Sequence, residues 1–433
     1  MQNQADKYGG KEITPGMDRG GGRADSSLHK RTFSSFKNPV YRLYYGGLLC
    51  QMFPMNMQMM ARSLLIYRLT GSAAILGIMS LAHAVPMLLF SLFGGVIADR
   101  VQKKYVIIAG QVGSAVVSLG VALALTLGYL SVESAGSWWI LVVASILQGT
   151  IMGLMMPSRQ AIMREIVSVE QLMNAVSLTT MGMNALQLFA PALTGFLIDA
   201  FDFEAVYYVM TASYLMGVVF IAFMPPTSAI TLRHSSALTN IKEGVNYIRH
   251  ETTLLLILAF TLFAVLLSMP YFVLLPIFAD DILKVGATGM GWLMSISGIG
   301  AIIGSATLAS LPNKKRGLML LASGVIMGLA LVSFSFSSSY SLSLAIMVFV
   351  GLGQTGRMTL ANTLLQYYVE DEYRGRVMSI YMMQFGLSSF GAFAAGLLAD
   401  SVGVQWAVGG FAMVLVLLSI LLLAFLPRIR NLD

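Results

Sequence analysis

Long apolar segments recur along the whole chain, and each is about as long as a helix that crosses a bilayer. A bilayer core needs about 20 consecutive apolar residues in helical form. The pattern predicts an all-α polytopic membrane protein with both termini on one side. On that measure its twelve predicted spans are 43–67, 73–98, 105–129, 137–157, 175–199, 205–225, 254–278, 288–311, 317–337, 341–361, 377–399 and 404–426.

A polar stretch at 227–253 divides these spans into two sets of six. Within it, residues 240–249 carry apolar side chains at helical spacing, which predicts an amphipathic connector on the cytoplasmic side. Residues 33–226 and 254–433 are then predicted to form two six-helix bundles. Residues 1–32 are polar and glycine-rich, which predicts a disordered cytoplasmic tail.

The two predicted bundles resemble each other near the ends of their fifth helices. Residues 195–199 read Gly-Phe-Leu-Ile-Asp, and residues 396–400 read Gly-Leu-Leu-Ala-Asp. Phe189 and Phe390 precede these motifs at the same offset. Internal repeats are typical of secondary transporters, whose substrate site lies between the two halves near the middle of the membrane. The repeat therefore predicts two pseudo-symmetric bundles.

Composition agrees with a membrane protein and excludes several other classes. Hydrophobic residues make up 57% of the 433 residues and charged residues only 11%, whereas soluble domains average about 25% charged. The net charge of +7 does not indicate nucleic acid, because the basic residues lie at the ends of apolar spans. One cysteine and four histidines provide no disulfide framework and no metal cluster. The sequence has no phosphate-binding glycine-rich loop, so we expect neither an enzyme nor a cofactor.

Lysine and arginine residues are distributed unequally between the two predicted membrane faces. Of 27 such residues, 23 fall on the side that carries both termini. The other four are Arg62, Arg68, Lys284 and Arg357. Basic residues are enriched on the cytoplasmic side of membranes. The count therefore predicts cytoplasmic termini in the plasma membrane, the inner membrane of the cell.

A short charged loop joins the second and third predicted spans. Residues 94–104 read Gly-Gly-Val-Ile-Ala-Asp-Arg-Val-Gln-Lys-Lys and are too polar for hydrocarbon. Their spacing resembles the signature loop of the major facilitator superfamily, G-x-x-x-D-R-x-x-[RK]-[RK], and the resemblance covers about residues 33–428. Residues 67–72 and 371–377 further resemble the branch that includes macrolide-efflux proteins and the enterobactin exporter.

The resemblance implies a secondary active transporter that works by alternating access, and the branch implies proton-coupled efflux of amphipathic small molecules, of drug or siderophore type. The implied partners are a small-molecule substrate, protons and the lipid bilayer, and we expect a monomer. The alternatives are a lysophospholipid flippase, an importer, or a non-transporting receptor or scaffold. One departure is Ser145, where drug antiporters of the superfamily often carry arginine.

The charged loop is predicted to act in gating. Gly95 lets its helix approach a neighbour closely, and Asp99 can bind the N-terminus of the eleventh span or an arginine. The resemblance implies that this contact is a latch that closes the cytoplasmic side. The basic residues included in the gating prediction are Arg100, Lys103, Lys104, Arg374 and Arg376. The first three of these can instead be charges that only set topology.

Four residues are predicted to bind substrate, namely Arg357, Gln354, Arg62 and Met55. A central charge costs roughly 2.5–3.5 kcal/mol on insertion scales, so Arg357 should face a watery cavity, unless it is a structural arginine with a buried partner. Arg62 can instead snorkel outward. The methionines around Met55 suit either a cavity for varied apolar molecules or ordinary packing. His83, inside the second span, is a predicted proton carrier, with hydrogen-bonded packing as the alternative.

Overall fold

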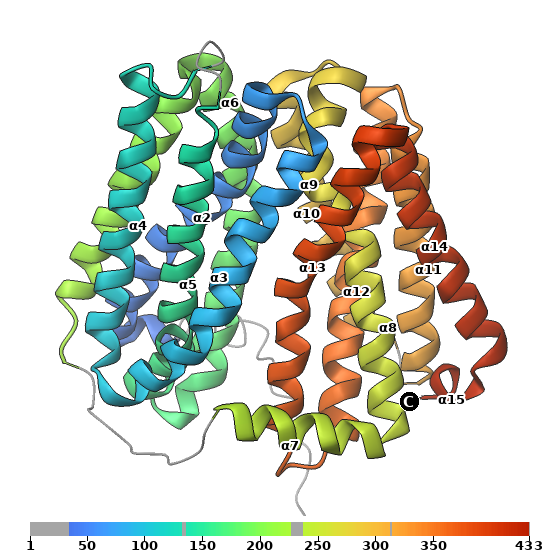
Figure 1. Ribbon diagram of the computed structural model, residues 1–433. Coiled ribbons are helices and arrows are strands. Elements are labelled where there is room, and N and C mark those ends of the chain that lie inside the picture. Colours follow the sequence, from blue (N-terminus) through green and yellow to red (C-terminus); the bar gives the residue numbers. More distant parts are fainter. Residues whose placement is uncertain (1–33, 132–135, 227–236, 312–313, 433) are drawn as a thin grey trace, which may run out of the picture.

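The computed structural model describes residues 34–131, 136–226, 237–311 and 314–432, and Figure 1 shows their arrangement. These ranges contain helices and short connections and no strand, so the all-α prediction is confirmed. The predicted tail at 1–32 lies outside the described residues. In chain order the elements are η1 (Ser34–Lys37), α2 (Pro39–Thr70), α3 (Ala73–Arg100), α4 (Lys103–Thr126), α5 (Trp139–Ile166), α6 (Val169–Ala222), α7 (Ala237–His250), α8 (Thr252–Ser268), α9 (Pro270–Ile277), η2 (Phe278–Ile282), α10 (Gly286–Ser310), α11 (Arg316–Ser335), α12 (Tyr340–Tyr368), α13 (Arg374–Val402), α14 (Val404–Phe425) and α15 (Pro427–Arg430).

Ten helical segments of the described chain are long and apolar enough to cross a membrane. One of them, α6, has 54 residues, which at about 1.5 Å per residue is more than twice the roughly 30 Å of a bilayer core. Its backbone breaks at Asp202, where φ is 65°. The two arms of α6 correspond to the predicted spans 175–199 and 205–225. The count reaches twelve when both arms and α2 are included, and it stays a prediction.

The helices form two groups that share a core at one end only. Figure 1 shows α2 to α6 on one side, the N-terminal group, and α8 to α14 on the other, the C-terminal group. One core cluster takes buried residues from both groups, such as Leu64 and Met290. The other two clusters, around Leu364 and around Ile107, each belong to one side. The groups therefore join near one end and have separate cores near the other.

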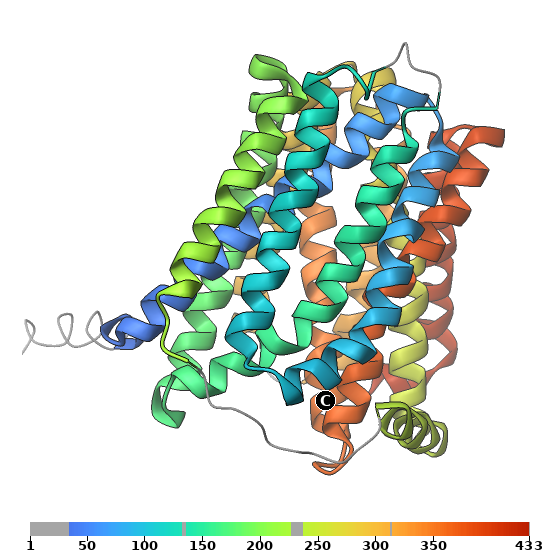
Figure 2. The same ribbon diagram turned by 60° about the vertical axis from the view of Figure 1, so that its left-hand side comes forward.

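The two ends can be named from these contacts. The end where the groups share a core, at the top of Figure 1, is called the sealed end. The opposite end carries the loop at 94–104 and is called the Asp99 end. In both views α7 lies at the Asp99 end, at the bottom of Figure 1 and Figure 2.

At the Asp99 end, α5 and α12 continue past their predicted last residues. Helix α5 ends at Ile166 rather than 157, and α12 ends at Tyr368 rather than 361. The added turns are amphipathic, because Ile162 of α5 and Leu364 of α12 are fully buried in the cores of their own groups. A prediction that follows only the apolar segment ends the helix before such amphipathic turns. Arg159, two residues beyond the predicted span 137–157, therefore lies within α5.

A helix, α7, lies within the stretch predicted to connect the two bundles and packs against the start of α13. Glu243 of α7 pairs with Arg376 at 2.9 Å. The rings of Tyr247 and Tyr373 stack in parallel with centroids 4.1 Å apart. These contacts attach α7 to the C-terminal group.

Candidate functional site

The sealed end is held by carboxylates that bind helix N-termini in the opposite group. Asp400, near the end of α13, accepts hydrogen bonds from Ser72 Oγ at 2.9 Å and from the backbone N–H groups of Ala73 and Ala74 at 2.8 and 3.1 Å. The first N–H groups of a helix have no partner within it, and the helix dipole attracts negative charge there. Asp400 of the C-terminal group therefore caps α3 of the N-terminal group.

The repeated motif makes a second contact of the same kind. Asp199 of α6 accepts a hydrogen bond from the backbone N–H of Thr288, near the start of α10, at 2.8 Å. Four residues before each carboxylate, a glycine allows the helices to touch. A Cβ at Gly396 would lie 2.5 Å from a carbonyl oxygen of α3, and one at Gly195 would overlap a carbonyl oxygen of α10. The two halves thus seal each other with equivalent residues.

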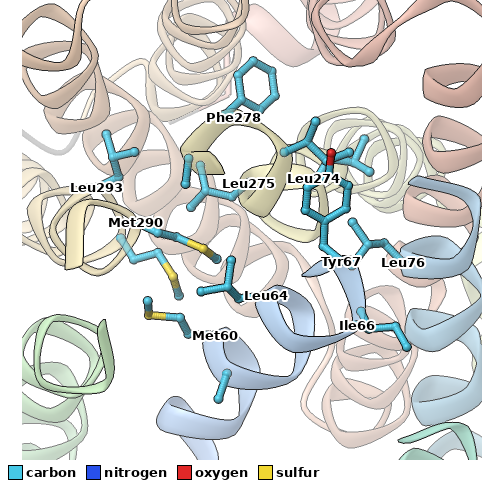
Figure 3. Close-up of a cluster of buried hydrophobic side chains, with 14 of the residues drawn as sticks. Met60, Leu64, Ile66, Tyr67, Leu76, Leu274, Leu275, Phe278, Met290 and Leu293 are labelled. Carbon is cyan, nitrogen blue, oxygen red and sulfur yellow. The ribbon is translucent and has the colours of Figure 1, made fainter. Parts of the chain in front are cut away.

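Further polar contacts cross between the groups beside these caps. Arg68 Nε lies 2.8 Å from Asp280 Oδ2. The Tyr67 hydroxyl donates a hydrogen bond to Asp281. Figure 3 shows apolar side chains of both groups at this end, among them Met60, Leu64, Leu274, Leu275, Met290 and Leu293. The seal therefore combines an apolar layer with capped helix starts and an ion pair.

Among the residues that the structure describes, the Asp99 end has no comparable closure in this state. Asp99 is exposed, and within the described ranges no hydrogen bond or ion pair reaches it. A Cβ at Gly95 would meet nothing within 4 Å, whereas Gly94 packs against α5 of its own group. Phe93 and Met173 are 61% and 79% exposed. The predicted Asp99 latch is not formed here, and it stays a prediction for a state in which this end is closed.

The basic residues of the gating prediction make local contacts. Lys103 Nζ lies 2.5 Å from Glu165 Oε1 of α5. Lys104 is buried and donates to the carbonyl oxygens of Ala222, at 2.8 Å, and Met224, which caps the end of α6. Arg100 is exposed. Arg374 pairs with Asp371 at 2.5 Å, and Arg376 pairs with Glu243 of α7.

The structure brings two predicted site residues, Arg62 and His83, into one cluster. Arg62 Nη1 donates to Ser145 Oγ of α5 at 3.5 Å, so the side chain turns inward instead of snorkelling outward. His83 of α3 lies beside Arg62 and the backbone of Ser145. Its Nδ1 is buried and has no partner among the described residues. Met55, on the same face of α2 as Arg62, is 38% exposed.

Arg357 is enclosed within the C-terminal group. Its side chain is 1% exposed, and neither Nε nor Nη1 has a hydrogen-bond partner in the described chain. Tyr381 of α13 is a neighbour. Gln354, one turn earlier on α12, is half-buried. Arg357 is therefore a buried cation without a carboxylate partner among the described residues, and a ligand reaches it only if the surrounding helices move.

Sequence reasoning missed the sealing roles of Asp199 and Asp400. The sequence carries a signal for them, because the glycine-to-aspartate spacing is repeated at residues 195–199 and 396–400. The partners of these carboxylates could not be predicted from the sequence. The residues at the start of α3 that bind Asp400 lie 326 or more positions away from it along the chain. Arg159, which lies beside Tyr44 and Met52 inside the N-terminal group, was also missed.

Comparison with known proteins identifies the family to which this fold belongs. The sequence profile of the Major Facilitator Superfamily matches residues 44–390 and 273–432. The chain belongs to this superfamily. Among solved structures, a bacterial homologue of the human lysosomal transporter Spinster, in an inward-facing and unoccupied conformation, aligns with a TM-score of 0.68, 12% identity and coverage of 95% of this chain and 98% of that one. At that identity the likeness of this major facilitator protein to Spinster is one of fold.

Two curated relatives cover most of the chain. The staphyloferrin A transporter of Staphylococcus aureus (strain NCTC 8325 / PS 47) is 23% identical over 77% of this chain and 83% of its own length. The multidrug efflux pump Tap of Mycolicibacterium fortuitum is 24% identical over 85% of this chain and 91% of its own. Family and relatives identify the chain as a non-enzymatic membrane transporter of small molecules.

Proposed function

We propose that this major facilitator transporter exports amphipathic small molecules, of drug or siderophore type, by alternating access and in exchange for protons. The observation that carries the proposal is the unequal joining of the two helix groups. They share a core and capped helix starts at the sealed end, while their cores are separate toward the Asp99 end. Rocking of two units, residues 33–226 and 254–433, about a site between them would alternate which end is open.

The name of one relative supports export. Tap is described as a multidrug efflux pump. The relative from Staphylococcus aureus is described as a transporter of staphyloferrin A.

Orientation follows from the distribution of charge, and we propose that the Asp99 end faces the cytoplasm. The protein would act as a monomer in the plasma membrane with both termini inside, because basic residues collect on that side. A Tyr129→Cys variant in a Cys50→Ser background tests this, since Tyr129 is exposed at the sealed end. An impermeant maleimide should label it in intact cells. Labelling only after permeabilisation would reverse the orientation.

Transport itself is tested with a panel of drugs and siderophores in inverted vesicles carrying an imposed pH gradient. Gradient-dependent accumulation of a panel member supports proton-coupled export. Accumulation that does not depend on the pH gradient excludes proton coupling. Transport in the opposite direction indicates an importer. Movement of lysophospholipid alone would identify a flippase, and binding without turnover a receptor.

Proton coupling is proposed to involve His83, because imidazole changes charge near neutral pH. A His83→Gln variant keeps a polar side chain of similar size but cannot become a cation. It should lose the response of transport to a pH gradient, while substrate binding weakens only partly because the glutamine amide can still donate a hydrogen bond. A variant that responds like the unmodified protein excludes His83 from coupling.

A further inference from the structure

Arg62 is a membrane-embedded cation whose charge is not balanced by a carboxylate of the described residues. Its hydrogen bond to Ser145 Oγ is 3.5 Å long, at the weak limit for such bonds. The titratable side chains near it are the imidazole of His83 and the phenol of Tyr207. A guanidinium carries five N–H donors. An unpaired charge within a membrane protein usually marks a substrate or ion pathway.

His83 adds a second unsatisfied group beside this guanidinium. Its Nδ1 is buried and unpaired in the described part of the chain. The backbone around it is rigidly placed, because a Cβ at Gly149 of α5 would overlap the His83 carbonyl oxygen. The close contact of α3 with α5 therefore holds His83 beside Ser145, and Arg62 of α2 joins them through its hydrogen bond to Ser145.

Apolar side chains continue from this cluster along α2. Met55 and Met59 are 38% and 43% exposed. Together with Arg62 they follow an i, i+4, i+7 spacing, which places all three on one helix face. Thioether side chains adapt to apolar groups of varied shape. The accessible face of α2 thus presents one cation beside a flexible apolar strip.

We propose that Arg62, His83 and Ser145 bind the carboxylate of an amphipathic anionic substrate whose apolar part lies along Met55 and Met59. The inference rests on the proposed transport function and names the class of its substrate. The planar guanidinium matches a carboxylate through two parallel hydrogen bonds. His83 adds a further donor when its Nδ1, which has no partner among the described residues, carries a ring proton. Arg357 is a poorer first contact, because it is 1% exposed in this state.

The test is equilibrium binding of three ligands with one apolar body and different heads. Phenylbutyric acid, phenylbutanol and phenylbutylamine are titrated calorimetrically into the protein in phosphatidylcholine nanodiscs, with empty nanodiscs as blanks. The acid should bind about tenfold or more tightly than the alcohol and the amine, as expected of a charge-assisted contact. Arg62→Gln should abolish this preference. Lys284→Asn, which removes an exposed cation elsewhere, should preserve it.

Equal binding of acid and alcohol to the unmodified protein overturns the proposal, as does a preference that survives Arg62→Gln. If Arg62→Gln does not fold, Arg62→Lys provides the same test. Acid binding should weaken at least threefold while alcohol binding stays constant, since lysine lacks the planar fork. Equal weakening of both, or of neither, overturns the assignment. These binding measurements need no transport. A failure of the vesicle transport assay therefore does not decide their outcome, and the two proposals can fail separately.

Discussion

The two ends of the transporter carry the same short motif in different states of engagement. Glycine followed four residues later by aspartate occurs at Gly195 with Asp199, at Gly396 with Asp400 and at Gly95 with Asp99. The first two motifs touch the opposite helix group at the sealed end. The third lies at the Asp99 end, where its carboxylate is exposed and its glycine faces open space.

The difference shows how this fold joins and releases its halves. A glycine brings two helices into backbone contact, and the aspartate one turn later adds an anion at a helix start. Where both are engaged, the groups share a core. The free motif at the Asp99 end has the parts for the same contact in the opposite state. Alternating access would then exchange one set of engaged motifs for the other.

The largest expected effect comes from adding one methyl group to an engaged motif. In Gly396→Ala the new Cβ would lie 2.5 Å from a backbone oxygen of α3, and overpacking of this kind costs about 1–3 kcal/mol. The sealed end should open more often. Labelling of Ser295→Cys reports this, because Ser295 is 2% exposed on the α10 face that meets α6.

Gly95→Ala is the matched control for this experiment. Its Cβ would meet nothing within 4 Å in the present state. Labelling at position 295 should therefore be no faster than in the unmodified protein. Faster labelling in Gly95→Ala, or unchanged labelling in Gly396→Ala, would contradict the contrast between the two ends.

Neutralising the carboxylates of Asp400 and Asp99 should have a smaller effect, and the two variants should change labelling at position 295 in opposite directions. Asp400→Asn weakens the cap on α3, and an anion at an exposed helix start contributes about 1 kcal/mol. Labelling at position 295 should rise severalfold. Asp99→Asn removes the contact predicted for the alternative state, so labelling should fall, together with transport. Equal responses of the two variants would show that Asp99 is not a counterpart of Asp400.

The ion pair of Arg68 with Asp280 should contribute less again. Its side chains are 35% and 19% exposed, and pairs of this kind contribute about 0.2–1 kcal/mol. A double-mutant cycle with Arg68→Gln and Asp280→Asn, read from labelling at position 295, measures the coupling. It should decline as salt is added. A coupling that is zero at low salt would remove this pair from the seal.

Much of this architecture is predictable from sequence, because bilayer thickness fixes the length of apolar segments and basic loops mark one face. The positions of the helices follow from that pattern, whereas the ends of α5 and α12 do not, because their last turns are amphipathic. Arg62 illustrates the limit for the site. Its side chain turns toward Ser145 because α5 lies beside α2. The local sequence around Arg62 does not predict this packing of α5 beside α2. Arg357 was recognisable as an interior charge, but not as one enclosed by its own group.

The smallest effects are expected from the ion pairs at the Asp99 end. Arg374 and Asp371 are 48% and 87% exposed and only three positions apart, so their coupling should be about 0–0.5 kcal/mol. Arg376 and Glu243 are more enclosed, at 26% and 46%, and Arg376 also lies over the Tyr373 ring at 5.0 Å. Neither pair joins the N-terminal group to the C-terminal group. Asp371→Asn and Glu243→Gln should therefore leave labelling at position 295 unchanged. Glu243→Gln weakens the contact of α7 with α13 and should lower the melting temperature of the protein by a few degrees at most. A clear rise in labelling from either variant would mean that these local pairs also control the sealed end.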